Sequence, residues 1–260
     1  MKKQNIVEAL TPRMDAEDLD AVLDRYAMRH ALVQNSKFIL SVPDNPMGHP
    51  RFKVMEVVKE MGLTIDPECF LLHINTFHTK EDMDDILAQA DAMKVRYLLV
   101  VTGDGSERLA KLDPASIGAD TQSATSVELL RYIHNAYPGR FRTGAAFNPY
   151  EPQDHEMEKI ARKIDAGAEY IITQPIIGRS EPAEKLATFG LPVTVGAWMS
   201  KRIDLLSECI GYELAPADRF DPMASLAELL GIYPDYGIYV SMLNFKRQWE
   251  PMRAMLAQRL

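Results

Sequence analysis

The sequence predicts a closed (β/α)8 barrel that forms one domain over residues 1–260, and three observations support this fold class. Short apolar runs alternate with amphipathic segments, as expected for βα units around a parallel sheet. Eight of the runs have the length and composition of buried strands. The chain has 260 residues, 47% of them hydrophobic, and a barrel of this class needs roughly 250 residues.

The expected strands are short apolar segments. In chain order they cover residues 5–10, 38–42, 69–74, 97–101, 142–147, 170–174, 192–196 and 238–242. An open doubly wound sheet would give the same alternation of elements. The count of eight strands, together with the absence of a GxGxxG motif after the first one, favours the closed barrel.

The expected helices carry apolar residues at positions i, i+3, i+4 and i+7, which places these residues on one helix face. Thr79 is the expected cap of one helix, 165–168 is the expected end of another, and the last helix is expected to begin at about Lys246. The clear stripes are Leu19, Val22, Leu23 and Tyr26; Val54, Val57, Val58 and Met61; Met83, Ile86, Leu87 and Ala90; and Met157, Ile160, Ala161 and Ile164.

Charge and composition argue against several classes of function. The formal net charge is -8 and the basic residues form no run, which disfavours nucleic acid and anionic membranes as partners. No stretch reaches the ~18 to 20 apolar residues of a membrane span, and the polar start lacks the apolar core of a secretion signal. Cys69 and Cys209 form no CxxC pair, so a reducing, cytoplasmic location is expected. The sequence has no HExxH, no Walker loop and no close His, Cys and Asp cluster, so neither a metal site nor a nucleoside triphosphatase is expected.

The candidate site residues are polar residues at the carboxyl ends of the expected strands, because barrel enzymes place their catalytic groups there. The connection 103–125 also points to this face, since it is much longer than the usual ~2 to 6 residues between a strand and its helix. The candidates are Glu8, His73, Asn75, Thr102, Asp104, Asn148, Gln174 and Asn244.

The two carboxylates among them each have a catalytic and a structural interpretation. Glu8 lies in the apolar run 6–10, where an inward carboxyl group would be desolvated and could act as a general acid. The alternative is an outward Glu8 paired with a lysine. Asp104 lies between two glycines, which lets the backbone approach a ligand closely, although Gly-Asp-Gly is also common in turns.

The remaining candidates are equally open. His73 fits a base, a cofactor contact or a hydrogen-bonded barrel histidine, and the last is the commonest role of a lone histidine. The Gln174 amide would recognise the donor and acceptor edges of a heterocycle, or it caps neighbouring backbone. Arg162 and Lys163 are either ligand contacts or part of a solvated helix face.

Together these residues resemble the methylenetetrahydrofolate reductase family, in the right order over nearly the whole chain. The strongest stretches are Ala161-Arg-Lys-Ile-Asp-Ala-Gly-Ala168 and Ile171-Ile-Thr-Gln174, which resemble the family's KxKxDAGA and TQ signature. Further resemblances are Val7-Glu-Ala-Leu-Thr-Pro-Arg13 to FEFFPPR, Leu72-His-Ile74 to PHLT, Val100-Val-Thr-Gly-Asp104 to LRGD, Gly144-Ala-Ala-Phe147 to the fifth strand, and Ser241-Met-Leu-Asn244 to YTLN.

The resemblance implies reduction of 5,10-methylenetetrahydrofolate to 5-methyltetrahydrofolate, with a hydride that passes from NAD(P)H through FAD. Glu8 would protonate N10 as the methylene bridge opens, and Asp104 would stabilise the cationic iminium. Gln174 would hold the pterin ring, with Asn244 and Lys246 as further substrate contacts. The implied FAD contacts are His73, Thr102, Gly103, Asp104, Phe147, Arg162, Lys163 and Ile172.

Several positions depart from the family pattern, and most of them concern the cofactor. Thr102 replaces an arginine that helps to hold the FAD phosphate, and Phe147 replaces a tyrosine next to the flavin. The segment 148–159 lacks a clean YPExHPE, and Phe245 stands in place of a substrate-binding arginine. FAD binding is therefore expected to be weak or altered, and direct hydride transfer from NAD(P)H remains open.

Two other functions compete with a folate reductase. A folate-binding protein of one-carbon transfer, or a lyase, would use the same acid without net reduction. A non-catalytic barrel subunit would keep the fold without turnover and would act with a partner subunit. A homo-oligomer is compatible with any of these functions.

Overall fold

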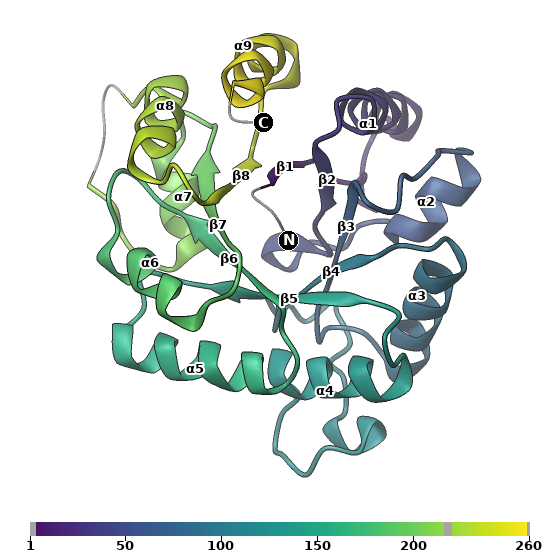
Figure 1. Ribbon diagram of the computed structural model, residues 1–260. Coiled ribbons are helices and arrows are strands. Elements are labelled where there is room, and N and C mark those ends of the chain that lie inside the picture. The colour runs from purple at the N-terminus through teal and green to yellow at the C-terminus, as the bar shows by residue number, and fades with distance from the viewer. Residues whose placement is uncertain (1–3, 216–219, 259–260) are drawn as a thin grey trace. The chain divides into compact units, whose positions relative to one another are not determined.

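The computed structural model describes residues 4–215 and 220–258. Within these residues eight strands form a closed barrel in chain order, and every described pair of neighbours is parallel, which confirms the predicted (β/α)8 fold class (Figure 1). The strands are β1 (Asn5–Glu8), β2 (Ile39–Val42), β3 (Phe70–Ile74), β4 (Tyr97–Val100), β5 (Arg142–Phe147), β6 (Tyr170–Pro175), β7 (Val193–Trp198) and β8 (Gly237–Ser241).

Helices follow the strands along the chain, and two of them, α7 and α8, lie between β7 and β8 in the sequence. Short 3-10 helices occur at Pro46–Gly48, Pro114–Ile117 and Leu186–Phe189. The α-helices are α1 (Leu19–Gln34), α2 (Val54–Glu60), α3 (Lys80–Ala92), α4 (Ser126–Ala136), α5 (Gln153–Asp165), α6 (Glu181–Lys185), α7 (Ile203–Ile210), α8 (Pro222–Ile232) and α9 (Phe245–Ala257).

The described chain divides into two compact units. Unit 1 comprises residues 1–8, 146–160 and 170–260 and contains β1 and β6 to β8. Unit 2 comprises residues 9–145 and 161–169 and contains β2 to β4. The expectation of one domain over residues 1–260 stays a prediction.

Several strand ends differ from the expected bounds, and for β7 and β8 the backbone shows the reason. β7 extends beyond residue 196, because its ladder with β8 continues through Ala197 and Trp198. β8 ends at Ser241, since Met242 has a φ of 55° and leaves the extended conformation. β1, which pairs with β8, ends at Glu8 and not at residue 10.

In unit 2, apolar stripes and polar caps define the helices. All four residues of the α3 stripe are buried, and the Thr79 hydroxyl accepts the Asp82 N–H (3.1 Å), as predicted for this helix start. The long connection before α4 contains the 3-10 helix Pro114–Ile117 and ends in a capping box formed by Thr125 and Glu128. In α1, by contrast, only Tyr26 of the expected stripe is buried, and Leu19, Val22 and Leu23 are half-buried.

In unit 1, close strand packing depends on small residues. β7 is buried along its whole length. Gly237 begins β8, and a Cβ there would lie 2.5 Å from the Thr194 hydroxyl and 2.7 Å from the Gln4 carbonyl oxygen. Glycine is therefore required for β8 to lie against both neighbouring strands. Within residues 4–215 and 220–258, no helix has the length and apolar character needed to cross a bilayer.

Candidate active site

Glu8 lies on the face of β1 that points away from α9. The Asn5 side-chain amide donates to the Leu256 carbonyl oxygen in α9 (3.4 Å), so Asn5 faces that helix. Successive side chains of a strand alternate between its faces, which puts Glu8 on the opposite face together with Ile6. In a barrel, the face away from the helices is the interior. The half-buried Glu8 carboxylate therefore points inward, which excludes the outward arrangement.

Two groups near the end of β8 hold the Glu8 carboxylate. The Tyr239 hydroxyl donates to Oε2 (3.1 Å), and the Met242 backbone N–H donates to Oε1 (3.5 Å). Tyr239 is the ladder neighbour of Ile6, so these two side chains share the inner face with Glu8. Met242 adopts a φ of 55°, and such backbone strain in a non-glycine residue concentrates at functional sites.

Gln174 lies at a β-bulge in β6. The ladder pairs Ile172 with Thr194 and then Pro175 with Gly196, which leaves one extra residue on β6. The Thr173 hydroxyl accepts the Gly196 N–H (3.0 Å) and donates to the Gln174 carbonyl oxygen (2.7 Å). A side chain thus replaces a backbone partner in the ladder. Bulges of this kind re-aim side chains next to active sites, and the Gln174 side chain is half-buried here.

His73 in β3 is a neutral histidine of unit 2. Its Nε2 lies 2.8 Å from the Ser41 hydroxyl oxygen in β2. Removal from water lowers the pKa of His73 to about 3, because burial disfavours the charged imidazolium. The side chain therefore serves as a neutral hydrogen-bonding group at neutral pH.

Asp104 follows β4 and is exposed. Its Oδ2 accepts the Met47 backbone N–H (2.8 Å), which ties the loop after β4 to the loop after β2. Gly103 has a φ of 85°, and a Cβ there would lie 2.7 Å from the Asn75 Cβ. Only glycine allows this backbone to pass so close to the end of β3, as the Gly-Asp-Gly sequence suggests.

A buried polar cluster holds the loop after β2. The sequence interpretation singled out Asn75 in it but missed Asp44 and His78. Asp44 Oδ2 lies 2.6 Å from His78 Nε2 and accepts the Asn75 N–H (3.3 Å), while the Asn75 side chain donates to the Asp44 carbonyl oxygen (2.8 Å). His78 is 7% exposed and Asn75 is 1% exposed. Asp44 lies just beyond β2, so the rule that selected the other strand-end residues also applies to it.

Three of the predicted polar candidates use their side chains to stabilise loops and helix ends. The Thr102 hydroxyl accepts the Ser126 N–H at the start of α4 (3.2 Å). The Asn148 amide donates to the Ile210 carbonyl oxygen (3.0 Å). The Asn244 side chain caps α9, where it accepts a backbone N–H (3.3 Å).

The other residues implied as ligand contacts differ widely in exposure. Phe147 is 1% exposed and Ile172 is 3% exposed, so both lie in the core of unit 1. Arg162 and Lys163 lie in the last turn of α5, which leads into the amino end of β6. Lys246 is exposed in the first turn of α9. No group of three or more His, Cys, Asp or Glu side chains that could hold a metal occurs in the part of the chain that the structure describes.

The structure thus brings some predicted residues together within each unit. In unit 1, Glu8 at the end of β1 contacts Tyr239 in β8. Gln174 lies on β6, two strands from β8 in the order of the barrel. In unit 2, His73 and Asp104 lie at the ends of neighbouring strands. The arrangement of Glu8, Asp104 and Gln174 in one pocket stays a prediction.

Solved structures share this fold at low sequence identity. A protein from Clostridium thermocellum that binds two copies of 5-methyl-5,6,7,8-tetrahydrofolic acid is 12% identical, with 99% of this chain and 95% of that chain covered and a TM-score of 0.59. A 2,3-dimethylmalate lyase of the PEP mutase/isocitrate lyase superfamily is 13% identical, with 98% and 78% covered and a TM-score of 0.53. A 7,8-dihydropteroate synthase from Vibrio fischeri ES114 is 13% identical, with 99% and 98% covered and a TM-score of 0.50.

Sequence comparison gives the family directly. A search of curated proteins finds no match. Residues 6–186, well over half of the chain, match the family described as methylenetetrahydrofolate reductase. The matched segment contains Glu8, Asp104 and Gln174. The chain therefore belongs to the methylenetetrahydrofolate reductase family.

Proposed function

We propose that this protein reduces 5,10-methylenetetrahydrofolate to 5-methyltetrahydrofolate with a hydride from NAD(P)H. Family membership supports a folate substrate. The observation that carries the proposal is the inward Glu8 carboxylate, which Tyr239 holds at the carboxyl end of β1. In (β/α)8 barrels the carboxyl ends of the strands share the catalytic face.

The first step that this geometry supports is the opening of the methylene bridge. The bond between the bridging carbon and N10 breaks, and N10 takes the proton of the neutral Glu8 carboxyl group as it leaves. Glu8 thereby becomes the carboxylate that accepts from Tyr239 and Met242. A carboxyl group held on the interior face of a strand is suited to this general-acid role. Loss of N10 generates a cationic iminium at N5, which then accepts the hydride.

Asp104 and Gln174 would act on the charge and the position of the pterin. A carboxylate near the iminium stabilises its positive charge in the transition state. The Gln174 amide supplies one donor and one acceptor to the edge of the ring, and the bulge in β6 fixes the backbone that carries it. The interaction of the Asp104 carboxylate with the Met47 N–H holds this loop before substrate binds.

The residues implied as flavin contacts fit FAD poorly. The Thr102 hydroxyl is engaged at the start of α4, and the Phe147 and Ile172 side chains are enclosed in the core. Three of the implied contacts are therefore committed to the fold itself. This supports weak FAD binding, or direct transfer of hydride from NAD(P)H to the iminium.

The folate assignment also receives support from a structural relative. The Clostridium thermocellum protein binds 5-methyl-5,6,7,8-tetrahydrofolic acid, the product of the proposed reaction. The alternative is a barrel that binds folate without reducing it. It is favoured by the same observation, because Thr102, Phe147 and Ile172 are engaged within the fold and do not offer a flavin site. NAD(P)H oxidation separates the two, since a protein that only binds folate would bind the product and leave NAD(P)H unchanged.

The proposal is tested by NAD(P)H oxidation with methylenetetrahydrofolate in the wild type and in Glu8→Gln. We expect turnover to fall ~100-fold or more, because the amide cannot protonate N10. Glu60→Gln, at an exposed position in α2, is the matched control and should keep full activity. Unchanged turnover in Glu8→Gln would remove this residue from the acid role, and an inactive wild type would reject the reductase.

The flavin question is tested separately by absorption, since bound oxidised flavin absorbs near ~450 nm. We expect this band to disappear on dialysis while NAD(P)H oxidation persists. A band that resists dialysis would contradict weak binding. Activity that disappears with the band and returns with added FAD would reject direct transfer.

A further inference from the structure

The loops after β1 and β2 bring two arginines directly opposite each other in unit 2. Arg13 and Arg51 form an isolated antiparallel bridge. Backbone hydrogen bonds flank it, from the Met14 N–H to the Pro50 carbonyl oxygen (3.1 Å) and from the Phe52 N–H to the Pro12 carbonyl oxygen (3.1 Å). Both loops follow the carboxyl ends of strands, which is the functional face of a barrel.

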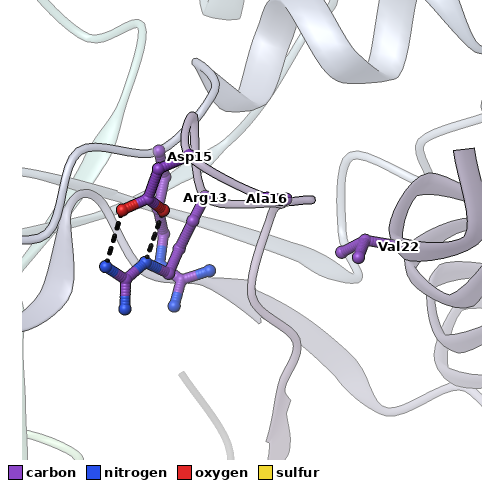
Figure 2. Close-up of a pocket in the computed structure, with 5 residues that line it drawn as sticks. Arg13, Asp15, Ala16 and Val22 are labelled. Atoms are coloured by element: carbon purple, nitrogen blue, oxygen red, sulfur yellow. Dashed lines mark hydrogen bonds and ion pairs between the residues drawn. The ribbon is translucent and has the colours of Figure 1, made fainter. Parts of the chain in front are cut away.

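A pocket of about 430 Å³ opens beside this pair. Figure 2 shows the Asp15 carboxylate against the Arg13 side chain, with Val22 on the neighbouring helix α1. Ala16 and the half-buried Val22 supply the apolar part of the wall. The lining residues are Arg13, Asp15, Ala16, Val22 and Arg51.

The pocket carries more positive than negative charge. Like charges directly opposite each other in an antiparallel pair are destabilising. Asp15 offsets the charge of Arg13, since its two oxygens accept from Arg13 Nε and Nη2 at 2.9 Å each. The hydrogen bond from Arg13 lowers the pKa of Asp15, and the charge of Arg108 adds to this effect. The pocket lining thus holds two arginines and one carboxylate, in a chain whose net charge is -8.

Both guanidinium groups are placed before any ligand binds. Arg51 Nη1 donates to the Thr11 carbonyl oxygen, and the Arg51 backbone N–H donates to Asn45 Oδ1 (2.8 Å). Thr11 and Asn45 are buried, so these anchors are fixed. Arg13 donates through Nε and Nη2 to the two Asp15 oxygens, which orients its guanidinium group. A guanidinium fork of this kind matches carboxylate and phosphate oxygens.

We propose that this pocket binds a multiply charged oxyanion, as carboxylates or as phosphate, on a small molecule. The ligand would bridge Arg13 and Arg51 and would compete with Asp15 for the Arg13 guanidinium. The Arg13 and Asp15 side chains are 41% and 57% exposed, so salt screens these ion pairs and binding is measured at low ionic strength. The site goes beyond the proposed reductase function and does not depend on it.

The test measures binding of citrate and of inorganic pyrophosphate by titration calorimetry at low ionic strength. We expect the dissociation constant of at least one of them to rise about tenfold in Arg13→Gln and in Arg51→Gln, through loss of a charge-assisted pair. Arg25→Gln, at an exposed position on α1, is the matched control and should bind like the wild type. Stronger citrate binding indicates carboxylates as the ligand groups, and stronger pyrophosphate binding indicates phosphate.

A variant that binds the anion more tightly than the wild type cannot be explained by misfolding, so one such variant is included. Asp15→Asn removes the competing carboxylate, so the same anion should bind several-fold more tightly than to the wild type. Arg51→Lys keeps the charge and should lose less affinity than Arg51→Gln. Absence of binding by both anions, or affinity that is unchanged in both glutamine variants, would overturn the proposal.

A second measurement asks whether the ligand is the folate tail, and this part alone rests on the proposed function. Affinity for 5-methyltetrahydrofolate is compared between the monoglutamate and the triglutamate. Tighter binding of the triglutamate that disappears in Arg13→Gln identifies the tail carboxylates. Equal affinities with retained citrate binding would leave the anion site in place and reject the tail as its ligand, whereas absent folate binding would count against the proposed function.

Discussion

The two carboxylates that the proposed reaction needs are held in different ways. Glu8 belongs to a strand, faces the barrel interior and is half-buried, and groups from β8 hold it. Asp104 belongs to the loop after β4, is exposed, and is held by the Met47 N–H in the loop after β2. Sheet pairing positions the first carboxylate, whereas packing between loops positions the second.

Because the two carboxylates are held differently, mutations around them should affect stability and activity to different extents. The orientation of Glu8 follows from the alternation of β1, so only a change of register would turn it outward. The position of Asp104 depends on the loop after β2, which Asp44, Asn75 and His78 hold by hydrogen bonds. Damage to the loop cluster should therefore lower stability first, and damage beside Glu8 should lower turnover first.

The largest effect is expected from Asp44→Ala in the loop cluster. Removal of the carboxylate leaves the buried His78 and Asn75 groups without their acceptor, at a cost of about 3 kcal/mol in the free energy of unfolding. Urea unfolding measures this loss. Asp24→Ala, at an exposed position in α1, is the control and should change stability by less than about 0.5 kcal/mol. A loss of that small size in Asp44→Ala would show that the cluster does not hold the loop.

A smaller effect is expected from Gly103→Ala, which moves the backbone that carries Asp104. The left-handed φ of 85° and the 2.7 Å approach to the Asn75 Cβ both oppose a side chain there. We expect a loss of about 2 kcal/mol or more. Gly62→Ala is the matched control, since Gly62 has a φ of 59° and no atom within 4 Å of its added Cβ, and it should lose only about 1 kcal/mol. Equal losses would assign the whole effect to backbone strain.

The two regions also differ in how much of each could be predicted from the sequence. Apolar periodicity predicted the βα units, the count of eight strands favoured the closed barrel, and alternation in a short strand allowed only two orientations for Glu8. The motif resemblance then implied that it is the acid. The Tyr239 contact and the Arg13–Arg51 bridge each join segments that are distant in the chain, so no local pattern encodes them. Asp44 was missed although it lies just beyond a strand.

Loop geometry explains the remaining differences from the sequence interpretation. Thr102 and Asn244 satisfy backbone groups at helix starts, which is a common role for such residues. The bulge in β6 depends on the Thr173 hydroxyl and on Gly196, and neither residue type is specific to a bulge. Side-chain capping and strand irregularities are decided by tertiary contacts, which a single sequence does not show.

The pH dependence of stability tests the interior of unit 2, beneath the loops. The pKa of His73 is about 3 in the folded chain, below the ~6.5 of an unfolded histidine, so the unfolded state binds the proton first. The contribution of neutral His73 to the free energy of unfolding is complete above pH ~6.5. It falls as the pH drops toward 3, by up to about 1.4 kcal/mol per pH unit. At pH 5 this amounts to about 2 kcal/mol. His73→Gln should flatten the unfolding curve between these limits, and an unchanged slope would show that His73 is not buried as a neutral group.

The smallest stability effect is expected at Tyr239, beside Glu8. Tyr239→Phe removes one hydrogen bond, which costs about 1 kcal/mol, while the ring keeps its packing. The Glu8 carboxyl then loses the hydroxyl that fixes its orientation, so kcat should fall several-fold but less than in Glu8→Gln. Urea unfolding and NAD(P)H oxidation measure the two quantities on the same sample. Asp44→Ala should show the reverse pattern, with a large loss of stability and a smaller loss of turnover. A Tyr239→Phe variant that loses stability but keeps its turnover would contradict the proposed difference between Glu8 and Asp104.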